Sequence, residues 1–231
     1  MAKYKEIVSM VLDMLKVTSD DAIFTEEHII FLAGRHRSFL LKQRYANDLK
    51  KQIPESNYQT ICVELDKGFD LGETACKSYY LRSKTSLPVL LPIGNSRIFP
   101  TESIFSNQIE MVSGDRLRYV GGNKWTQNII YGAWGPTNKL ILKSDNPQFL
   151  YLKSVSVRGI FENAEEASDL ECNNQGNTSV CDILDRNFPI EDALIVPLIE
   201  LIVKELSPSI ALPEDKTNDA NDNQVSSAKI N

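Results

Sequence analysis

Apolar side chains recur at helical spacing in two segments near the N-terminus. In residues 3–16 they fall three or four positions apart, which predicts an amphipathic helix. A second helix is predicted to begin at Thr25, a residue type that caps helix N-termini. Glu26 and Glu27 would lie in its first turn, where the helix dipole favours anions. The apolar pattern of this helix continues to about residue 46.

The period changes from helical to alternating after residue 57. Ile61, Val63 and Leu65 fall on one face of an extended segment, as expected for a half-buried strand. Further short β-rich runs are separated by Gly, Pro, Asn and Ser, and two of them flank a Gly-Pro turn as a hairpin. We expect about seven strands, which is typical of a small antiparallel sandwich or barrel. The nine β-rich runs from which these strands are expected to come are 58–65, 79–83, 87–93, 96–100, 109–113, 116–121, 128–134, 139–144 and 149–161.

Helical patterning returns after the β-rich region. Residues 162–171 predict a short helix, and a last helix is predicted to begin with Pro189 at its first position. This last helix is apolar on several faces, which indicates burial against more than one partner. Pro197 would lie in its interior and should kink it, and Pro208 should prevent its continuation.

The fold class predicted from these elements is α+β. The N- and C-terminal helices, in residues 1–54 and 162–207, are expected to form one bundle, and residues 55–161 are expected to form an inserted antiparallel β-sandwich or barrel. Residues 208–231 are polar and acidic with few large apolar side chains, so we expect a disordered tail in the isolated chain.

Composition is ordinary for a globular protein, but charge is unevenly distributed. The 231 residues are 42% hydrophobic and 24% charged, with a net charge of −6. Residues 1–51 hold nine basic and seven acidic side chains, residues 52–159 hold twelve and nine, and residues 160–231 hold four and fifteen. A mildly basic front and an acidic rear could attract each other between copies, although solvated faces with an acidic tail would give the same distribution.

Targeting signals do not stand out in the sequence. The first residues are amphipathic and include Glu6 and Asp13, which does not fit a signal peptide. Nowhere does the chain approach the roughly 20 apolar residues needed to span a bilayer. We therefore expect a chain that is made and kept in a cytoplasm, with no membrane partner.

The cysteines do not form a recognisable framework. None belongs to a C-x-x-C pair, and four in a chain of this length are too few for a disulfide-stapled domain. Cys172 and Cys181 flank a polar stretch and could meet across a loop. We expect the four to be structural or incidental; they are Cys62, Cys76, Cys172 and Cys181.

Motifs for catalysis or cofactor binding are not found. The sequence has no P-loop, no dinucleotide-binding glycine pattern, no zinc-protease motif and no nucleophile elbow. His28 and His36 lie eight residues apart without an evident nucleophile or a set of four metal ligands. We therefore predict no enzyme, no metal and no cofactor.

A basic run is the most suggestive chemical feature. Six basic side chains fall within 17 residues of the second helix and its end, namely Arg35, Arg37, Lys42, Arg44, Lys50 and Lys51. They are predicted to form a solvated or protein-facing surface, and a nucleic-acid element is the alternative. The candidate interface residues taken from this run, the last helix and the tail are Arg35, Arg37, Lys42, Arg44, Ile195, Ile199, Val203, Glu214 and Asp215.

Several segments together resemble the ring, or head-to-tail adaptor, proteins of crAss-like bacteriophages. The resemblance extends from the N-terminus to about residue 207 and rests on the succession of segments, because the family has no catalytic signature. The segments are "YKEIVSMVLDML", "FTEEHIIFL", "FLLKQRY", "IPESNYQTICVEL", "RYVGGNKW…NIIYGAWGP", "NPQFLYLKSVSVRGIFE" and "CDILDRNFPIEDALIVPLIELIVKEL".

The resemblance implies a structural role in the virion. Such proteins form a dodecameric ring beneath the portal, join the capsid to the tail and leave a channel through which DNA passes without sequence-specific binding. The implied partners are further copies of the chain, the portal protein and neighbouring tail or ring proteins, after assembly in the host cytoplasm. A ring subunit has two different flanks that meet head to tail, which would explain a very apolar last helix and a polar arm.

Two other classes of function remain open at the level of sequence. A β-sandwich module could bind carbohydrate through an aromatic platform, although aromatic side chains more often fill a core. A DNA-associated regulator would bind duplex DNA with a steep dependence on salt concentration. The aromatic residues of the platform hypothesis are Tyr79, Tyr80, Trp125, Tyr131 and Trp134.

Overall fold

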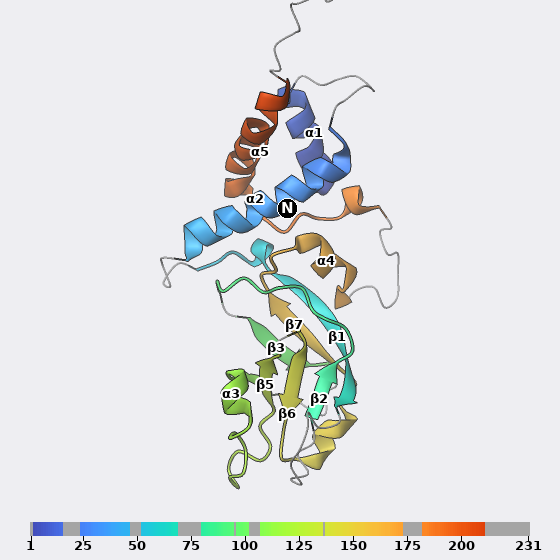
Figure 1. Ribbon diagram of the computed structural model, residues 1–231, viewed down its shortest axis with the longest axis vertical. Helices are drawn as coiled ribbons and strands as arrows, with labels where there is room; N and C mark the ends of the chain where they lie inside the picture. Colours follow the sequence, from blue (N-terminus) through green and yellow to red (C-terminus); the bar gives the residue numbers. More distant parts are fainter. Residues whose placement is uncertain are drawn as a thin grey trace, which may run out of the picture.

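Two hydrophobic cores, one helical and one built from strands, lie one after the other along the long axis of the molecule (Figure 1). The computed structural model describes residues 2–15, 24–46, 52–68, 80–94, 96–101, 107–135, 137–172 and 182–210. The predictions for residues 211–231 of the tail, including Glu214 and Asp215, lie outside the described residues, as do those for Lys50, Lys51, Cys76, Tyr79 and Cys181.

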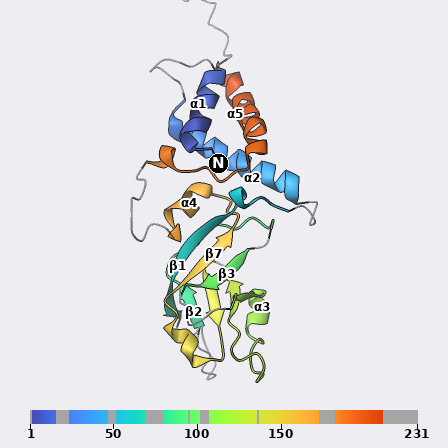
Figure 2. The same ribbon diagram turned by 180° about the vertical axis from the view of Figure 1, so that it is seen from behind.

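Three helices form the upper core. They are α1 (Tyr4–Leu15), α2 (Glu26–Tyr45) and α5 (Ile195–Ile210), and Figures 1 and 2 show α1 and α5 side by side above α2. One face of α1 is buried as its spacing predicted, and α2 begins after Thr25, whose side chain accepts a hydrogen bond from the His28 N–H at 3.3 Å. The predicted bundle of N- and C-terminal helices is confirmed.

The start of the last helix was predicted wrongly. Pro189 lies in an extended segment, and α5 begins only at Ile195, after the 3₁₀ turn η5 (Asp192–Leu194). Pro197 is therefore the third residue of α5, where a backbone N–H would have no intrahelical acceptor. Pro197 therefore removes no intrahelical hydrogen bond, and the reason for predicting a kink at this residue does not apply. The helix also passes Pro208 and ends at Ile210.

Within the described residues, seven strands form one sheet in the order β3-β7-β1-β2-β6-β5-β4. All neighbours are antiparallel except β4 and β5, which are parallel. The two ends of this order meet through a bridge between Ile98 and Ile109, so the sheet is a nearly closed barrel. The strands are β1 (Gln59–Gly68), β2 (Tyr80–Ser83), β3 (Arg97–Pro100), β4 (Glu110–Met111), β5 (Tyr131–Trp134), β6 (Leu140–Lys143) and β7 (Ser154–Gly159).

Alternation along β1 builds the lower core as predicted. Ile61, Val63 and Leu65 are all buried. Ile61 pairs with Val157 and Val63 with Val155 on β7, so the buried side chains of the two strands lie side by side. The hairpin of β5 and β6 is also confirmed.

The run 87–93 does not form the predicted strand. Within this run, which is described throughout, one isolated β-bridge forms, between Leu90 and Phe161. Pro88 and Pro92 lack the N–H groups that a ladder needs, so the segment instead leads from the β core into the helical core.

Two other predicted strands contain turns. Within 116–121 the chain leaves the short helix α3 (Gly114–Leu117) and turns. The run 149–161 is a strand only in its second half, because the 3₁₀ turn η2 (Pro147–Tyr151) occupies the first half, capped by Asn146. Two more 3₁₀ turns are η1 (Glu55–Asn57) and η4 (Ile183–Asp185).

A disulfide joins α4 (Ala164–Asp169) to the sheet. Cys172, just after α4, is bonded to Cys62 on β1, with a Cα–Cα distance of 4.7 Å. The suggested pairing of Cys172 with Cys181 was therefore wrong. Backbone pairing explains the contact, because Ile61 bridges Glu171 and the N–H of Cys62 donates to the Leu170 carbonyl at 2.8 Å.

Candidate interface surfaces

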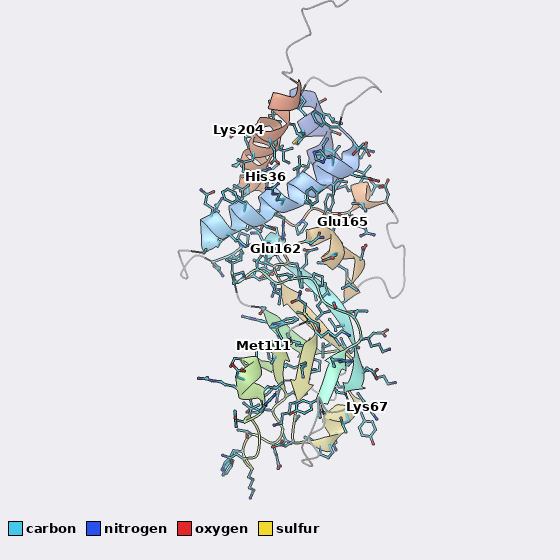
Figure 3. The ribbon with its side chains drawn as sticks, viewed as in Figure 1. His36, Lys67, Met111, Glu162, Glu165 and Lys204 are labelled. Atoms are coloured by element: carbon cyan, nitrogen blue, oxygen red, sulfur yellow. A yellow bond between two sulfur atoms is a disulfide. The ribbon has the colours of Figure 1, made fainter. Side chains whose placement is uncertain are left out.

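Helix α2 forms the side of the helical core that faces the β module and carries four of the nine candidate interface residues. Figure 3 shows His36 on the side of α2 that faces α5, and Glu162 on the side that faces the β module. Burial on these two sides explains why the apolar residues of α2 do not form a single stripe. The remaining side of the helix is exposed to solvent.

The side chain of Arg37 is not on the surface. It is 0% exposed, and its guanidinium donates to three backbone carbonyls: Nε to Pro189 at 2.6 Å, Nη1 to Phe161 at 2.8 Å and Nη2 to Asn57 at 3.2 Å. These carbonyls belong to the segments before α5, after β7 and before β1. Burial lowers the pKa of Arg37 to about 10, so it stays cationic at neutral pH.

This finding corrects the assignment of Arg37 to an interface. A side chain that is fully buried and bonded within its own chain offers nothing to a partner, so its role is to join the helical part to the β module. The sequence held a signal for this burial. Ala33 and Leu41, one helical turn before and after Arg37, are apolar and buried, which places Arg37 in the middle of a buried stripe.

A second polar cluster lies at the C-terminal end of α2. The hydroxyl of Tyr45 donates to Glu191 Oε2 at 2.8 Å, and Arg44 Nη1 lies 3.1 Å from Glu191 Oε1. The N–H of Glu191 donates to Asn57 Oδ1 at 2.9 Å, which connects this cluster to the Arg37 site. Burial, and then the hydrogen bond to Glu191, raises the pKa of Tyr45 to about 12. Arg44 is therefore partly exposed, but its guanidinium already forms an ion pair with Glu191 of the same chain.

The other two candidate cations are exposed and form ion pairs within the chain. Lys42 Nζ lies 3.2 Å from Glu162 Oε1, and Arg35 Nη1 lies 3.5 Å from Glu205 Oε1 on α5. His36 Nε2 lies 2.7 Å from the other oxygen of Glu205. Both cations lie partly in solvent, where such pairs contribute little to stability.

Two phenylalanines share the exposed side of α2 with these cations. Phe31 is 65% exposed and Phe39 is 55% exposed. Phe31, Arg35 and Phe39 follow one another at intervals of four residues, so they lie on one side of the helix, with Lys42 three residues further on. We refer to these four residues as the α2 outer face. The cations of this surface were predicted from the sequence, but its aromatic residues were not.

The candidates on α5 divide between core and surface. Ile199 is buried in the helical core, whereas Ile195 and Val203 are half-buried. Val196, which was not among the predicted interface residues, is 59% exposed. Val196 and Val203, seven residues apart, lie on one side of α5 and form a second partly exposed apolar surface, which we call the α5 flank. Ile195 instead lies on the side of the helix that carries the buried Leu198 and Ile202.

The aromatic platform of the carbohydrate hypothesis is not formed by those of its residues that the structure describes, which exclude Tyr79. Tyr131 and Trp134 are three residues apart on β5, so they point to opposite faces of the sheet, and Trp134 packs against the β core. Tyr80 and Tyr131 are both paired with Lys143 and share its face. Trp125 is 86% exposed and lies in a loop, so the expectation that it fills the core was wrong.

The described residues also show what kinds of site this part of the chain lacks. They contain no group of three or more His, Cys, Asp or Glu side chains arranged to hold a metal ion. None of the described helices has the length and apolar character needed to cross a membrane.

Comparison with known proteins identifies the family. The family model described as phage tail ring protein 2 matches residues 6–224. The chain belongs to this family of phage tail ring proteins. It is also 49% identical over 220 residues to Ring protein 2 of Bacteroides phage crAss001, an alignment that covers 95% of this chain and 96% of the relative. The resemblance inferred from the sequence is thereby confirmed.

Membership of the ring protein family changes how the surfaces are interpreted. A structural ring protein of a crAss-like phage is a component of the virion, which supports a structural rather than a catalytic role. For such a protein the functional sites are surfaces that contact other subunits. The α2 outer face and the α5 flank, each apolar in part and exposed, are two candidates among the described helices.

Proposed function

We propose that the chain is a subunit of a ring in the head-to-tail connector below the portal, where it joins the capsid to the tail. The ring has a central channel for DNA, which passes without sequence-specific binding, and we propose a dodecamer. The observation that supports this function most is the α2 outer face. Phe31 and Phe39 lie about 12 Å apart along the helix, from 1.5 Å per residue, and remain exposed in the single chain.

Contacts between copies follow from the positions of the two surfaces. A closed ring needs two different surfaces on each subunit that fit each other. The α2 outer face of one copy is proposed to contact the α5 flank of the next. Both surfaces belong to the helical part, which leaves the β module to face outward or downward from the ring.

The division of labour along the chain is also a proposal. Residues 1–54 and 162–207 form the helical part that faces the portal, and residues 55–161 form the β module. The residues that follow the end of α5 at Ile210, including Glu214 and Asp215, form an arm that contacts a neighbouring subunit or ring protein. We propose assembly in the host cytoplasm before incorporation into the virion.

Mass photometry of the purified full chain, alone and mixed with the portal protein, tests the function. The expected result is a single closed oligomer, with twelve subunits, and a larger complex when portal protein is added. A chain that stays monomeric both alone and in the presence of portal protein would contradict the proposal. Binding of one defined DNA sequence, or of glycans in an array, would favour the regulator or the carbohydrate module instead.

Deletion of residues 213–231 tests the arm. The segment has Val225 and Ile230 as its only large apolar side chains, so its loss should leave the melting temperature of the monomer nearly unchanged. Association with the ring or its neighbours should weaken. If a protease removes this segment equally fast from free chain and from intact virions, the arm has no docking role.

A further inference from the structure

The loop of residues 118–130 presents an exposed tryptophan at one end of the molecule. We call it the tip loop. It follows α3 and reaches the end of the long axis that is farthest from α1 and α5 (Figure 1). Trp125 and Tyr119 are each 86% exposed, the highest values among the large hydrophobic side chains of the described residues. A tryptophan exposed to this extent adds little to the fold that presents it.

The tip loop is held by hydrogen bonds with three consecutive residues at the end of β6, namely Lys143, Ser144 and Asp145. Lys143 Nζ donates to the carbonyls of Arg118 and Val120 at 3.2 Å and 3.1 Å. Ser144 Oγ lies within hydrogen-bonding distance of the carbonyls of Gln127 and Ile129, at 3.3 Å and 3.1 Å. The loop is thus anchored on both sides of its apex.

Asp145, the third of these residues, fixes the turn itself. Its carboxylate accepts a hydrogen bond from the N–H of Gly122. Gly121 and Gly122 have φ values of +88° and +69°, a region that side chains rarely permit. A Cβ on Gly121 would also lie 2.6 Å from a carboxylate oxygen of Asp145. The glycine pair is therefore required by this turn.

The backbone at Trp125 is ordered by its own neighbours. Asn123 Oδ1 accepts a hydrogen bond from the Trp125 N–H at 3.2 Å, and the Asn123 carbonyl accepts one from the Thr126 N–H at 2.9 Å. A side chain presented on an ordered turn loses less conformational entropy when it binds. Tryptophan is also among the residues that dominate the binding energy of protein interfaces.

We propose that the tip loop inserts Trp125 into an apolar pocket with an acidic rim on a different protein of the virion. The charge of the loop region indicates the acidic rim, because residues 112–130 carry three exposed cations, Arg116, Arg118 and Lys124, against one acid, Asp115. Lys143 and Asp145, which contact the loop from the end of β6, add one charge of each sign. The choice of a different protein rests on the proposed function, in which copies meet through α2 and α5 at the opposite end of the molecule.

Hydroxyl-radical footprinting of the full chain tests this contact directly. Oxidation of Trp125 is read by mass spectrometry in the free chain, in the purified homo-oligomer and in intact virions. Trp125 is expected to be oxidised in the first two states and protected in the virion. Equal oxidation in the virion, or protection already in the homo-oligomer, would overturn the proposal. Neither result depends on how many subunits the ring contains.

Substitution of Trp125 identifies the partner. Trp125→Ala should weaken binding to the purified portal protein or to one of the purified tail or ring proteins of the same virion by roughly thirtyfold, as for a tryptophan at the centre of an interface. Lys124→Glu should weaken it less. Tyr151→Ala, which removes another exposed aromatic side chain of the β module, is the matched control and should have no effect.

Folding and ring formation separate this proposal from the ring function. Trp125→Ala should keep the melting temperature and the oligomer of the unaltered chain, because the side chain is exposed. If Trp125→Ala binds every purified virion protein as the unaltered chain does, the docking role is refuted. It is equally refuted if the substitution instead abolishes binding of duplex DNA or of a glycan.

Discussion

Two sides of helix α2 have opposite chemistry. On the inner side the charged side chain of Arg37 is buried and bonded to three carbonyls, whereas on the outer side two phenylalanines lie in solvent. A single chain gains nothing from exposed phenylalanines, and a buried cation is costly unless the surrounding groups satisfy it. The inner side therefore serves the architecture of the subunit, and the outer side is available for assembly. Substitutions on the two sides should have separable effects.

The largest effect is expected for Arg37→Ala. The substitution leaves three carbonyls without their donor at the junction, and the free energy of unfolding should fall by about 3–5 kcal/mol. Urea denaturation of the purified chain measures this loss. Arg35→Ala, two residues earlier on the exposed side, is the control and should change stability by less than about 1 kcal/mol. A loss below that value for Arg37→Ala would show that the junction does not depend on the guanidinium.

The next effect concerns assembly and leaves folding intact. In Phe31→Ser with Phe39→Ser, the free energy of unfolding should stay within about 0.5 kcal/mol, because exposed side chains contribute little to it. Formation of the oligomer should weaken by roughly thirtyfold or more, as for aromatic residues at the centre of an interface. Mass photometry over a concentration series provides the measurement. Tyr151→Ala is the control. An unchanged oligomer would remove the α2 outer face from the ring contact.

A smaller effect is expected for Tyr45→Phe, and it should depend on pH. Loss of the hydrogen bond to Glu191 should cost about 1–2 kcal/mol at neutral pH. The pKa of Tyr45 is raised from 10.0 to about 12 in the folded chain, so below pH 10 the hydroxyl is protonated in both states. Between pH 10 and pH 12 the unfolded chain releases its proton first, and the stabilisation is lost.

The difference in unfolding free energy between the unaltered chain and Tyr45→Phe should therefore shrink as the pH rises through this window. Denaturation at several pH values measures it. A difference that stays constant from pH 8 to pH 12 would mean that the hydroxyl does not act through its bound proton.

The smallest effect is expected for the exposed ion pairs. Lys42→Ala removes the pair with Glu162, in which both side chains are nearly half exposed, and should cost no more than about 0.5 kcal/mol. The cost should vanish at high salt, where exposed charges are screened. Glu162→Gln should give the same small loss in thermal denaturation. A loss that persists in high salt would indicate a packing role for the lysine stem.

Local patterns in the sequence predicted the elements whose causes are local. The alternation of Ile61, Val63 and Leu65 predicted β1, and the cap at Thr25 predicted the start of α2. Predictions from β propensity were wrong where the backbone conformation of a turn determines the structure instead. The left-handed glycine pair Gly121 and Gly122 turns a segment that was predicted to be a strand.

Contacts between segments that are far apart in the chain could not be predicted from the sequence. Cys62 and Cys172 are 110 residues apart, and only the pairing of the segment after α4 with β1 brings their sulfur atoms together. The burial of Arg37 depends in the same way on three separate segments that converge on one side of α2. Of the candidate interface, the sequence indicated the cations of the outer face but not Phe31 and Phe39, because a phenylalanine in a helix is ordinarily expected in a core.

The bridge between Ile98 and Ile109 bears on how such a protein avoids misassembly. An open sheet edge offers unpaired backbone groups to any other strand and can template amyloid-like aggregates. Here the two terminal strands of the sheet order, β3 and β4, are four and two residues long, and β3 ends in Pro100, which has no N–H to offer. A subunit that accumulates before it is built into a particle thus presents little backbone for indiscriminate pairing, and recognition is left to side chains, which can distinguish one neighbour from another.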